Sequence, residues 1–491
     1  MTLTVTDLFA GSGGSSTGLA DVPGLELVLA MNHWQLAIDT HASNHPRADH
    51  KCADISQYDP RLAPRTDILW ASPSCTHHSQ ASGKKRNHGA AAGDRQPDLF
   101  GEILPDEAAE RSRATMWDVL RFTELHRYRA VIVENVVDVM QWVMFPAWRQ
   151  AWGLLGYEIR FVFMNSMHAQ AGGVPAPQSR DRWYAVAWPK GNRAPDLEKW
   201  TRPRAWCVTC DEWVYAVKSW KRPDREPWGR YRAQYVWRCP RVKCRNSVIE
   251  PGWLPAASAI DWTLPGERIG DRVKPLAEKT MARICAGLSK FYGSADGLLV
   301  PAGGSWNETA YPLTEAMRTR TTRESEGLLI PVEGRDGKVA GHVREPLRTQ
   351  TARNETGLLV PYYGNGNAAT TSEPDRTMTT HDRYAFVVPL RNNNTPKSVR
   401  DPLDTFAAAG NHHALATTAV PNIEDCMFRM LTPDEIKRGM AFPDDYTLLG
   451  NKREKVRLCG NAVTPPAARD LGAAVAESLG HVVGEPAAVA A

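Results

Sequence analysis

Through about the first 190 residues, short apolar segments alternate with turns and helical segments, and this rhythm constrains the possible fold more than any other feature. The pattern predicts strands at residues 3–9, 28–31, 67–71, 130–133 and 183–188, and helices at 15–20, 35–43 and 115–126. Strands and helices that alternate at this spacing form a parallel sheet with helices packed on both faces. We therefore expect a doubly wound α/β fold in this part of the chain.

Two predicted strands end in residues that could carry out chemistry. Pro73, Ser74 and Cys75 close one apolar run, and Glu134 closes another further along the chain. Open α/β sheets bind ligands at the carboxyl ends of their strands, so these side chains are expected at one site. A thiolate that attacks an electron-poor ring needs an acid to take up the developing charge, which makes Cys75 and Glu134 a candidate pair. The alternative for Cys75 is an inert buried thiol.

A glycine-rich turn follows the first predicted strand. The segment from Asp7 to Gly14 reads Asp-Leu-Phe-Ala-Gly-Ser-Gly-Gly. Glycines at such a turn let the backbone approach a ligand closely, although tight turns without a ligand contain them too. Asp54 could accept a hydrogen bond from an adenine amino group, and an exposed loop aspartate is the other interpretation of this residue.

The length of the chain and its cysteine content limit the classes of protein to which it can belong. A chain of 491 residues exceeds one typical core, so we expect two or more domains. No segment approaches the roughly 18 apolar residues of a membrane span, and the N-terminal residues lack the pattern of a signal peptide. We therefore expect a cytoplasmic protein that does not contact membranes. Nine cysteines, an odd number, favour thiol chemistry or metal binding over a disulfide framework.

Residues 199–250 form a basic stretch that is rich in Trp. They contain 13 Lys and Arg against 5 Asp and Glu, which suits a polyanion with stackable bases; a solvated surface is the alternative. Within this stretch, Cys207-x-x-Cys210 and Cys239-x4-Cys244 could supply the closed four-sulfur shell of a structural zinc ion. The 28 residues between the two pairs exceed the usual zinc-ribbon spacing, so four reduced structural thiols are the other possibility.

The middle of the chain also contains an internal repeat. Residues 297–301, 327–331 and 357–361 share the pattern Gly-Leu-Leu-Val/Ile-Pro at intervals of 30 residues, and residues 386–389 are a looser copy. A strand this short cannot bury itself, so the copies are expected to stack or pair with neighbours. Segments that contain Arg and Thr precede the later copies and favour a phosphate-contacting face. Simple duplication without a function is the alternative.

Several short motifs occur in a fixed order in the two flanks of the chain. They are the run from Asp7 to Gly14, Asp54-Ile55, Pro73-Ser74-Cys75, Glu134-Asn135-Val136, Gln178-Ser179-Arg180-Asp181-Arg182, Arg429-Met430-Leu431-Thr432 with Glu435, and Gly460-Asn461-Ala462-Val463. Their order resembles the motif series of the DNA cytosine-5 methyltransferases. The match covers about half of the chain and leaves its middle unmatched, where that family has a variable target recognition domain.

The resemblance implies an α/β, Rossmann-like S-adenosylmethionine-dependent methyltransferase domain with a mostly β or irregular inserted recognition domain. We expect the catalytic domain at residues 1–190 and 426–480, the target recognition region at 191–425 and a frayed tail at 481–491. Within the recognition region, residues 205–250 would form a zinc ribbon and residues 270–420 the repeats.

The resemblance also implies a role for each catalytic residue. Cys75 would attack C6 of a cytosine turned out of the duplex, and Glu134 would hydrogen-bond or protonate N3 of the ring. Arg180 and Arg182 would surround the flipped nucleotide, with Arg182 as the contact to the base O2; surface charge is the alternative for either arginine alone. C5 of the base would then take the methyl group of S-adenosylmethionine.

A further set of residues is expected to bind S-adenosylmethionine. It comprises Asp7, Phe9, Gly11, Gly13, Gly14, Asn32, His33, Asp54, Ile55, Pro73, Asn461, Ala462 and Val463. Two positions depart from the family pattern. Asn32 stands where the family has an acidic residue on the ribose hydroxyls, and Ser74 replaces the second proline before the nucleophile, which loosens a rigid turn.

The expected partner is duplex DNA, bound by a monomer in a bacterial or phage-infected bacterial cell. Whether a restriction endonuclease accompanies the enzyme stays open at this point. An RNA methyltransferase with the same chemistry is one alternative, and a catalytically inactive DNA-binding descendant is another.

Overall fold

The computed structural model describes most of the two flanks of the chain and short segments of its middle. The described residues are 2–73, 107–264, 266–278, 280–282, 284–285, 298–301, 311–312, 315–318, 326–331, 385–389, 397–398, 413–417 and 423–484. Cys75, Ser74 and the repeat copy at 357–361 lie outside them. So do most of the segments that contain Arg and Thr, and the last seven residues.

Contacts divide the chain into two compact units. The first comprises Met1–Asp261, Thr314–Glu324 and Leu431–Ala491, and the second comprises Trp262–Leu313 and Ser325–Met430. The cysteine-rich stretch therefore belongs to the same unit as the N-terminal strands and helices. The assignment of residues 191–425 to target recognition stays a prediction.

A seven-stranded sheet forms the centre of the first unit, in the order β3-β2-β1-β4-β5-β8-β6. Its strands are β1 (Leu3–Leu8), β2 (Leu25–Asn32), β3 (Asp49–Cys52), β4 (Ile68–Ala71), β5 (Ala130–Asn135), β6 (Tyr157–Asn165) and β8 (Asp181–Pro189). The first five strands of this order pair in parallel, whereas β8 runs antiparallel to both β5 and β6. The expected α/β class is confirmed, but the sheet is mixed, because no long helix that could make a parallel crossover connects β6 to β8.

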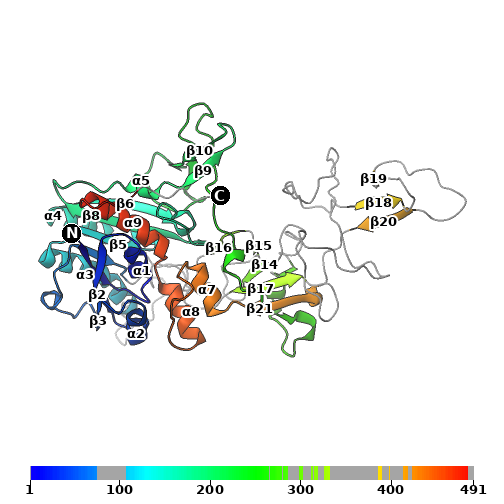
Figure 1. The fold of residues 1–491 in the computed structure, drawn as a ribbon, viewed down its shortest axis with the longest axis horizontal. Coiled ribbons are helices and arrows are strands. Elements are labelled where there is room, and N and C mark those ends of the chain that lie inside the picture. Colours follow the sequence, from blue (N-terminus) through cyan, green and yellow to red (C-terminus); the bar gives the residue numbers. More distant parts are fainter. Residues whose placement is uncertain are drawn as a thin grey trace, which may run out of the picture. The chain divides into compact units, whose positions relative to one another are not determined.

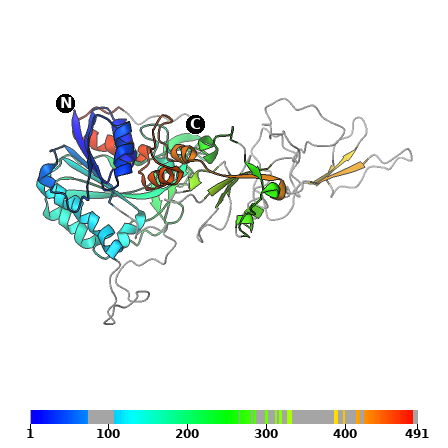
Figure 2. The same cartoon turned by 90° about the horizontal axis from the view of Figure 1, so that it is seen from below.

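Helices cover both faces of this sheet. On one face, α1 (Gly14–Ala20) and α9 (Pro465–Ser478) pack on side chains such as Trp70. On the other, α3 (Glu107–His126) and α4 (Phe145–Leu154) pack on the neighbouring residues of the same strand. Successive residues of a strand point to opposite faces, so one buried strand contributes to both cores. Figure 2 shows α3 and α4 in cyan on one side of the sheet and α9 in red on the other.

The C-terminal segment differs from its sequence prediction. The sequence Cys-Gly-Asn-Ala-Val at residues 459–463 predicts a turn between two helices, but helix α8 (Lys452–Asn461) continues through the first three of these residues. Asn451 and Glu454 form a reciprocal capping box at its start, which provides the helix signal. Thr432 and Glu435 form the same motif at the start of α7 (Pro433–Gly439). The sequence also predicts a loop at residues 174–182, but β7 (Gln178–Ser179) lies within it and β8 begins at Asp181.

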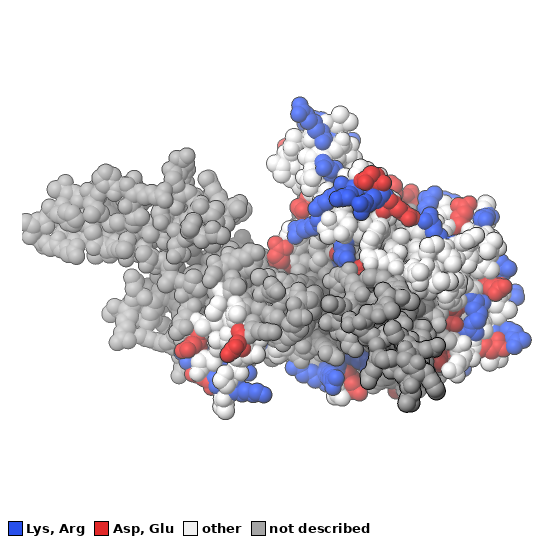
Figure 3. Space-filling model, turned by 180° about the vertical axis from the view of Figure 1, so that it is seen from behind, with Lys and Arg blue, Asp and Glu red and all other residues white. Residues whose placement is uncertain are grey.

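The cysteine-rich stretch of the first unit consists of two hairpins. After α5 (Leu197–Thr201), β9 (Arg204–Cys207) pairs with β10 (Glu212–Tyr215), and β11 (Val217–Trp220) pairs with β12 (Tyr235–Arg238). The β9–β10 hairpin projects from its unit (Figure 1), and Lys and Arg side chains gather on it and beside it (Figure 3).

Shorter elements complete the first unit. They are α2 (Gln35–Asn44), the parallel pair β7 (Gln178–Ser179) and β16 (Met317–Arg318), and the 3-10 helices η1 (Pro60–Leu62), η3 (Val137–Gln141), η4 (Ser166–His168) and η5 (Ala256–Ala259). Among the described residues, no helix is long and apolar enough to cross a membrane.

The described residues of the second unit form short antiparallel strands, α-helical residues at 280–282, and the 3-10 helices η6 (Ile269–Asp271) and η7 (Ile423–Asp425). Five strands follow the order β13 (Glu267–Arg268), β21 (Cys426–Met430), β17 (Glu326–Pro331), β14 (Leu298–Pro301) and β15 (Tyr311–Pro312). A separate sheet contains β19 (Lys397–Ser398), β18 (Ala385–Pro389) and β20 (His413–Thr417). The first two repeat copies pair with each other, Leu298 opposite Leu329, in the way that strands too short to bury themselves must do.

Candidate functional site

The carboxyl end of β1 carries a buried acidic group. Asp7 is fully buried, and its Oδ2 accepts hydrogen bonds from the hydroxyl groups of Ser15 (2.6 Å) and Ser16 (2.7 Å). Burial raises the pKa of Asp7 to about 7, and the two serine hydrogen bonds work against this rise. Among the described atoms, Asp7 Oδ1 has no hydrogen-bond partner. The carboxyl group therefore changes charge near neutral pH beside the glycine-rich turn.

The turn after β1 is shaped by residues with positive φ. Phe9 has φ 60°, Gly11 has φ 56° and Gly13 has φ 91°, a region that favours glycine. A Cβ on Gly14 would lie 1.9 Å from the carbonyl oxygen of Val463, whereas a Cβ on Gly11 would meet nothing within 4 Å. The turn thus packs against the C-terminal segment at Gly14 and faces open space at Gly11.

Arg180 holds the C-terminal segment in place. Its Nη2 donates to the carbonyl oxygens of Ala462 (2.9 Å) and Gly460 (3.2 Å), and its side chain is buried. The structure therefore brings Ala462 and Val463 to the first turn, next to the last residue of α8, Asn461. Arg180 contacts this backbone, which sequence reasoning did not foresee, and its catalytic role stays a prediction.

The carboxyl ends of β2 and β3 lie side by side. Asn32 pairs with Cys52 in the parallel register, and the carbonyl oxygen of Asn32 accepts from Ala53 N at 3.0 Å. The side-chain oxygen of Asn32 accepts a hydrogen bond from Trp34 N at 2.9 Å, so this oxygen already takes part in a local turn.

The remaining cofactor candidates near this edge differ in burial. His33 and Asp54 are exposed, and Ile55 is buried. The carboxylate of Asp54 accepts hydrogen bonds from Ser56 N and Gln57 Nε2, both within its own loop. These local bonds also fit an ordinary loop aspartate, so cofactor binding by Asp54 stays a prediction.

A buried ion pair lies where β5 ends and β8 begins. Arg182 Nε lies 2.9 Å from Glu134 Oε1, and the two side chains are only 12% and 11% exposed. The antiparallel register sets Glu134 opposite Tyr184, which places Arg182 just beyond the paired strand end. Burial raises the pKa of Glu134 above its ordinary value, although the neighbouring arginine charges lower it. Glu134 can therefore hold a proton more readily than an exposed glutamate.

The segment that leads to Cys75 is tied to the same edge. The buried Pro73 accepts a hydrogen bond from Asn135 Nδ2 at 3.4 Å through its carbonyl oxygen, and Asn135 Oδ1 accepts from Val136 N at 2.8 Å. Asn135 thus connects the end of β5 to the chain that follows β4. Cys75 itself lies outside the described residues.

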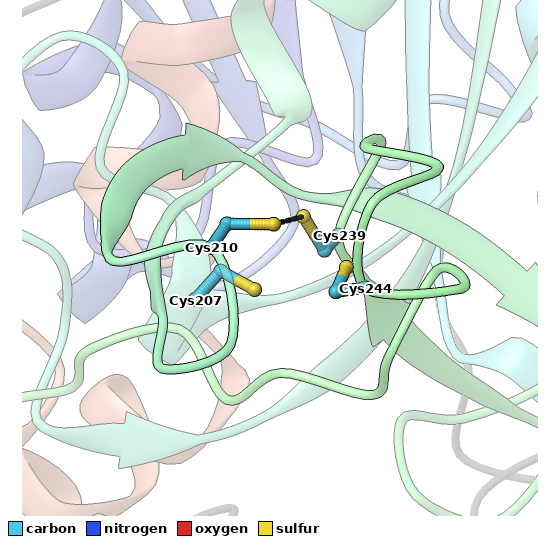
Figure 4. Close-up of side chains that lie close together, drawn as sticks. All are labelled: Cys207, Cys210, Cys239 and Cys244. Carbon is cyan, nitrogen blue, oxygen red and sulfur yellow. Dashed lines mark hydrogen bonds between the residues drawn. The ribbon is translucent and has the colours of Figure 1, made fainter.

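Four cysteines of the two hairpins form a compact cluster. The Sγ atoms of Cys207, Cys210, Cys239 and Cys244 all lie within 4.8 Å of one another, and all four residues are buried. Figure 4 shows the thiols pointing toward a common centre, two from the turn between β9 and β10 and two from the segment after β12. All four are free thiols.

The backbone around this cluster is folded tightly. Asp211, Arg245 and Asn246 adopt positive φ, and Arg241 N donates to Cys239 Sγ at 3.4 Å. Hydrogen bonds from Ser247 lower the pKa of Cys244 to about 6. A left-handed residue at Asp211 follows the first cysteine pair, whereas two left-handed residues and the N–H···S bond to Cys239 shape the second cysteine loop.

Two contacts near the site involve residues that sequence reasoning did not single out. Tyr446 hydrogen-bonds through its hydroxyl group to the carbonyl oxygen of Ser12 in the glycine-rich turn. Arg230 Nη2 lies 2.6 Å from Asp138 Oδ2, four residues after Glu134. The only sequence signal for this pair is the position of Asp138 soon after a strand end and of Arg230 in the basic stretch.

Comparison with known proteins gives one family match. The model of the family described as C-5 cytosine-specific DNA methylase matches residues 3–206 and 339–477. These ranges span more than half of the chain and include the β1 turn, the Glu134 strand end and the C-terminal segment.

Two curated proteins of Herpetosiphon aurantiacus are similar in sequence. The Type II methyltransferase M.HgiDI is 27% identical over 192 residues, which are 38% of this chain and 53% of that protein. The Type II methylase M.HgiEI is 30% identical over 186 residues, 37% of this chain and 36% of that protein. The chain therefore matches about half and about a third of the length of these relatives.

Solved structures also resemble the chain. A crystal structure of a Spodoptera frugiperda DNMT2 mutant has a TM-score of 0.47 and 13% identity, covering 96% of this chain and 99% of that one. The S. pombe Dnmt2 methyltransferase has a TM-score of 0.45 and 15% identity, covering 98% and 100%. Similarities with TM-scores below 0.5 do not determine a fold or a function.

Proposed function

This chain belongs to the C-5 cytosine-specific DNA methylase family, and from that membership we propose that it transfers a methyl group from S-adenosylmethionine to C5 of a cytosine turned out of duplex DNA. The observation that carries the proposal is the buried pair of Glu134 and Arg182, at the strand edge to which Asn135 ties Pro73. A carboxyl group with a raised pKa beside a fixed guanidinium suits protonation of a ring nitrogen and contact with a carbonyl oxygen.

The proposed reaction uses three side chains. The Cys75 thiolate forms a bond to C6 while Glu134 donates a proton or a hydrogen bond to N3, which makes C5 nucleophilic. Arg182 contacts the base O2. C5 takes the methyl group with the thioether S-adenosylhomocysteine as the leaving group. C5 then gives its proton to a base such as water, the electron pair of the C5–H bond expels Cys75 as thiolate, and a proton taken up at N3 returns to Glu134.

S-adenosylmethionine supplies the electrophilic methyl group. The residues at the ends of β1, β2 and β3 fit such a ligand, because a Cβ at Gly11 would meet nothing within 4 Å, Asn32 is the last residue of β2, and Asp54 follows the adjacent strand β3. We propose that the remaining cofactor-binding residues line the same site at these strand ends. They are Asp7, Phe9, Gly13, Gly14, His33, Ile55, Pro73, Asn461, Ala462 and Val463.

The test separates this function from its two alternatives. Wild type and Cys75→Ala are incubated with methyl-labelled S-adenosylmethionine and with duplex DNA or structured RNA. We expect label in DNA only, and only with wild type. Label in RNA alone would show that RNA and not DNA is the substrate. Label in DNA after incubation with Cys75→Ala would show that Cys75 is not the nucleophile. Cofactor binding without label in any nucleic acid would support a binding-only descendant.

A second experiment tests the covalent step directly. A duplex with 5-fluorocytosine at the target should trap wild type as an adduct that survives denaturation, because C5 then has no proton to lose. Glu134→Gln should trap more slowly, since it cannot protonate N3. Recovery of only noncovalent complex, under conditions where unmodified duplex is methylated, would argue against attack at C6.

We also propose that the cysteine cluster binds one structural zinc ion. Zinc held by four thiolates at about 2.3 Å needs sulfur atoms roughly 3.8 Å apart. The four sulfur atoms lie within 4.8 Å of one another, with those of Cys210 and Cys239 4.0 Å apart, so a small movement would close them on an ion. Four ligands leave no open position for catalysis. Elemental analysis should find about one zinc per chain, which is lost in Cys207→Ser and Cys239→Ser and retained in Cys285→Ser, an exposed cysteine outside the cluster. Equal zinc content in all variants would end this proposal.

The remaining proposals concern the setting of the enzyme. We propose a cytoplasmic monomer whose residues 191–425 select the target sequence, with the paired repeat strands among them. The two curated relatives are named as Type II enzymes, and whether a restriction endonuclease accompanies this chain stays open. Methylation mapping of DNA from a host that expresses the protein would reveal the target sequence.

A further inference from the structure

The cysteine hairpins contact the catalytic strand ends through a buried ion pair. We call residues 202–253 the cysteine module. Arg230 of this module lies 2.6 Å from the carboxylate of Asp138, whose side chain is 1% exposed. Asp138 belongs to η3, which begins three residues after Glu134. The charge of Arg230 therefore compensates a buried carboxylate next to the proposed acid, and a buried charge without such a partner is strongly unfavourable.

A second contact reaches the other half of the Glu134–Arg182 pair. The backbone N–H of Tyr231 donates to Asp181 Oδ1 at 3.0 Å. Asp181 is half-buried and is the first residue of β8, directly before Arg182. Two consecutive residues of the cysteine module, Arg230 and Tyr231, therefore contact the segments that carry both members of the pair.

Aromatic packing joins the same surfaces. Trp237 Nε1 donates to His168 Nδ1 at 3.1 Å, and the ring centroids of His168 and Tyr231 are 4.6 Å apart, edge to face. Lys218 contacts the carbonyl oxygen of Phe163 in β6, and its Nζ lies 4.7 Å from the centre of the Tyr235 ring. The contact between the module and the sheet is thus a packed interface of buried rings and polar groups, as in a domain interior.

The cluster fixes the chain that carries these contacts. Strand β12 leads from the Arg230 loop directly to Cys239, and Tyr235 N donates to the carbonyl oxygen of Arg230 at 3.3 Å. Cys239 N also donates to Ser247 O at 2.9 Å, which closes the second cysteine loop. An ion bound by the four sulfur atoms would therefore restrain the C-terminal end of β12. Through β12 it would also restrain the loop that contains Arg230.

We propose that the cysteine module is a brace for the catalytic strand ends, in which Arg230 is a positioning residue that acts on Glu134 and Arg182 through Asp138 and the neighbouring Tyr231–Asp181 contact. The catalytic consequence rests on the proposed function of Glu134. The brace sets the rate of the chemical step, whereas a module that only contacts DNA would change the KM for DNA.

The experiment compares kcat and the KM for duplex DNA in wild type, Arg230→Gln, Arg230→Lys and Arg149→Gln, all with their zinc content measured. Arg149 is the matched control, because it joins α4 to Glu226 of the same module at 2.7 Å through side chains that are 51% and 59% exposed. We expect Arg230→Gln to lower kcat on the order of 10- to 100-fold with little change in KM, since small displacements of reacting groups have effects of this size. Arg230→Lys should recover much of the rate, and Arg149→Gln should behave as wild type.

Hydrogen exchange of the same proteins gives a readout that does not depend on activity. Peptides that cover residues 130–141 and 178–189 should exchange faster in Arg230→Gln and in zinc-depleted wild type, but not in Arg149→Gln. Unchanged exchange in both peptides would overturn the brace, as would equal kcat in both glutamine variants. If wild type transfers no methyl group but the exchange still rises, the brace stands and the proposed function fails.

Discussion

The buried pair of Glu134 and Arg182 makes a prediction about stability that follows from its geometry. At 2.9 Å and an effective dielectric of about 20, the two charges attract by about 6 kcal/mol before desolvation is subtracted. Arg182→Met removes the partner and leaves the carboxylate in a site where it is about 11% exposed. Breaking a buried pair from one side costs about 3–5 kcal/mol, because the remaining charge is no longer compensated.

A double-mutant cycle isolates this effect. Urea unfolding at pH 8 is measured for wild type, Arg182→Met, Glu134→Gln and the double variant. The double variant should recover at least about 2 kcal/mol of the loss in Arg182→Met, because no uncompensated charge remains. If the two single costs add to within about 0.5 kcal/mol, the residues do not interact as the structure indicates, and the argument from the ion pair is refuted.

The cost of Arg182→Met should also depend on pH, in a direction that follows from the pKa of Glu134. The folded-state pKa of Glu134 is raised by burial, so its protonated form contributes stability that is fully present below the ordinary pKa and is lost as the pH rises through the raised value. Removing Arg182 raises that pKa further. The cost of Arg182→Met should therefore be larger at pH 8 than at pH 4.5. An equal cost at both values would contradict the charge explanation.

Three further predictions concern other parts of the first unit. The pKa of Asp7 is about 7, so the stability that its protonated form contributes to the folded state is lost as the pH rises through that value. The free energy of unfolding of Asp7→Asn, measured in urea, should therefore rise by up to about 4 kcal/mol relative to that of wild type between pH 4 and pH 8. A difference between the two proteins that is the same at both pH values would contradict this. Gly14→Ala should cost about 1–3 kcal/mol in thermal melting because its Cβ would lie 1.9 Å from a carbonyl oxygen, whereas Gly153→Ala, with nothing within 4 Å, should not destabilise. Glu435→Ala should cost about 1–3 kcal/mol, more than Glu454→Ala, because the first capping glutamate is fully buried and the second is partly exposed; equal costs would argue against burial as the reason.

The sequence predicted the elements whose hydrophobic pattern is local. The strands that contain Asp7 and Glu134 are apolar runs that end at polar residues, and the structure has them within a few residues of the expected bounds. It missed β6, because Tyr157–Asn165 mixes charged and apolar residues at an exposed edge of the sheet. The direction of β8 also depends on which strand it pairs with, a choice that local propensity does not contain.

The candidate site divides in the same way. Short motifs were enough to nominate Glu134 and Arg182, which the structure brings to 2.9 Å. No motif relates Asp138 to Arg230, which are 92 residues apart in sequence and meet only through tertiary packing. The contact of Arg180 with the C-terminal backbone is equally invisible, because a carbonyl acceptor has no residue type.

The packing of α9 against α1 has a consequence for how the protein is made. The first helix and its glycine turn touch Val463 and Pro465 so closely that added Cβ atoms would lie about 2 Å from their carbonyl oxygens. That cover is translated some 450 residues later, roughly 20–90 s at typical rates of synthesis. During this time the face of the nascent sheet that α1 covers lacks its second helix, α9, which makes it a natural client for chaperones. The contact between α1 and α9 cannot form until residues 465–478 have left the ribosome.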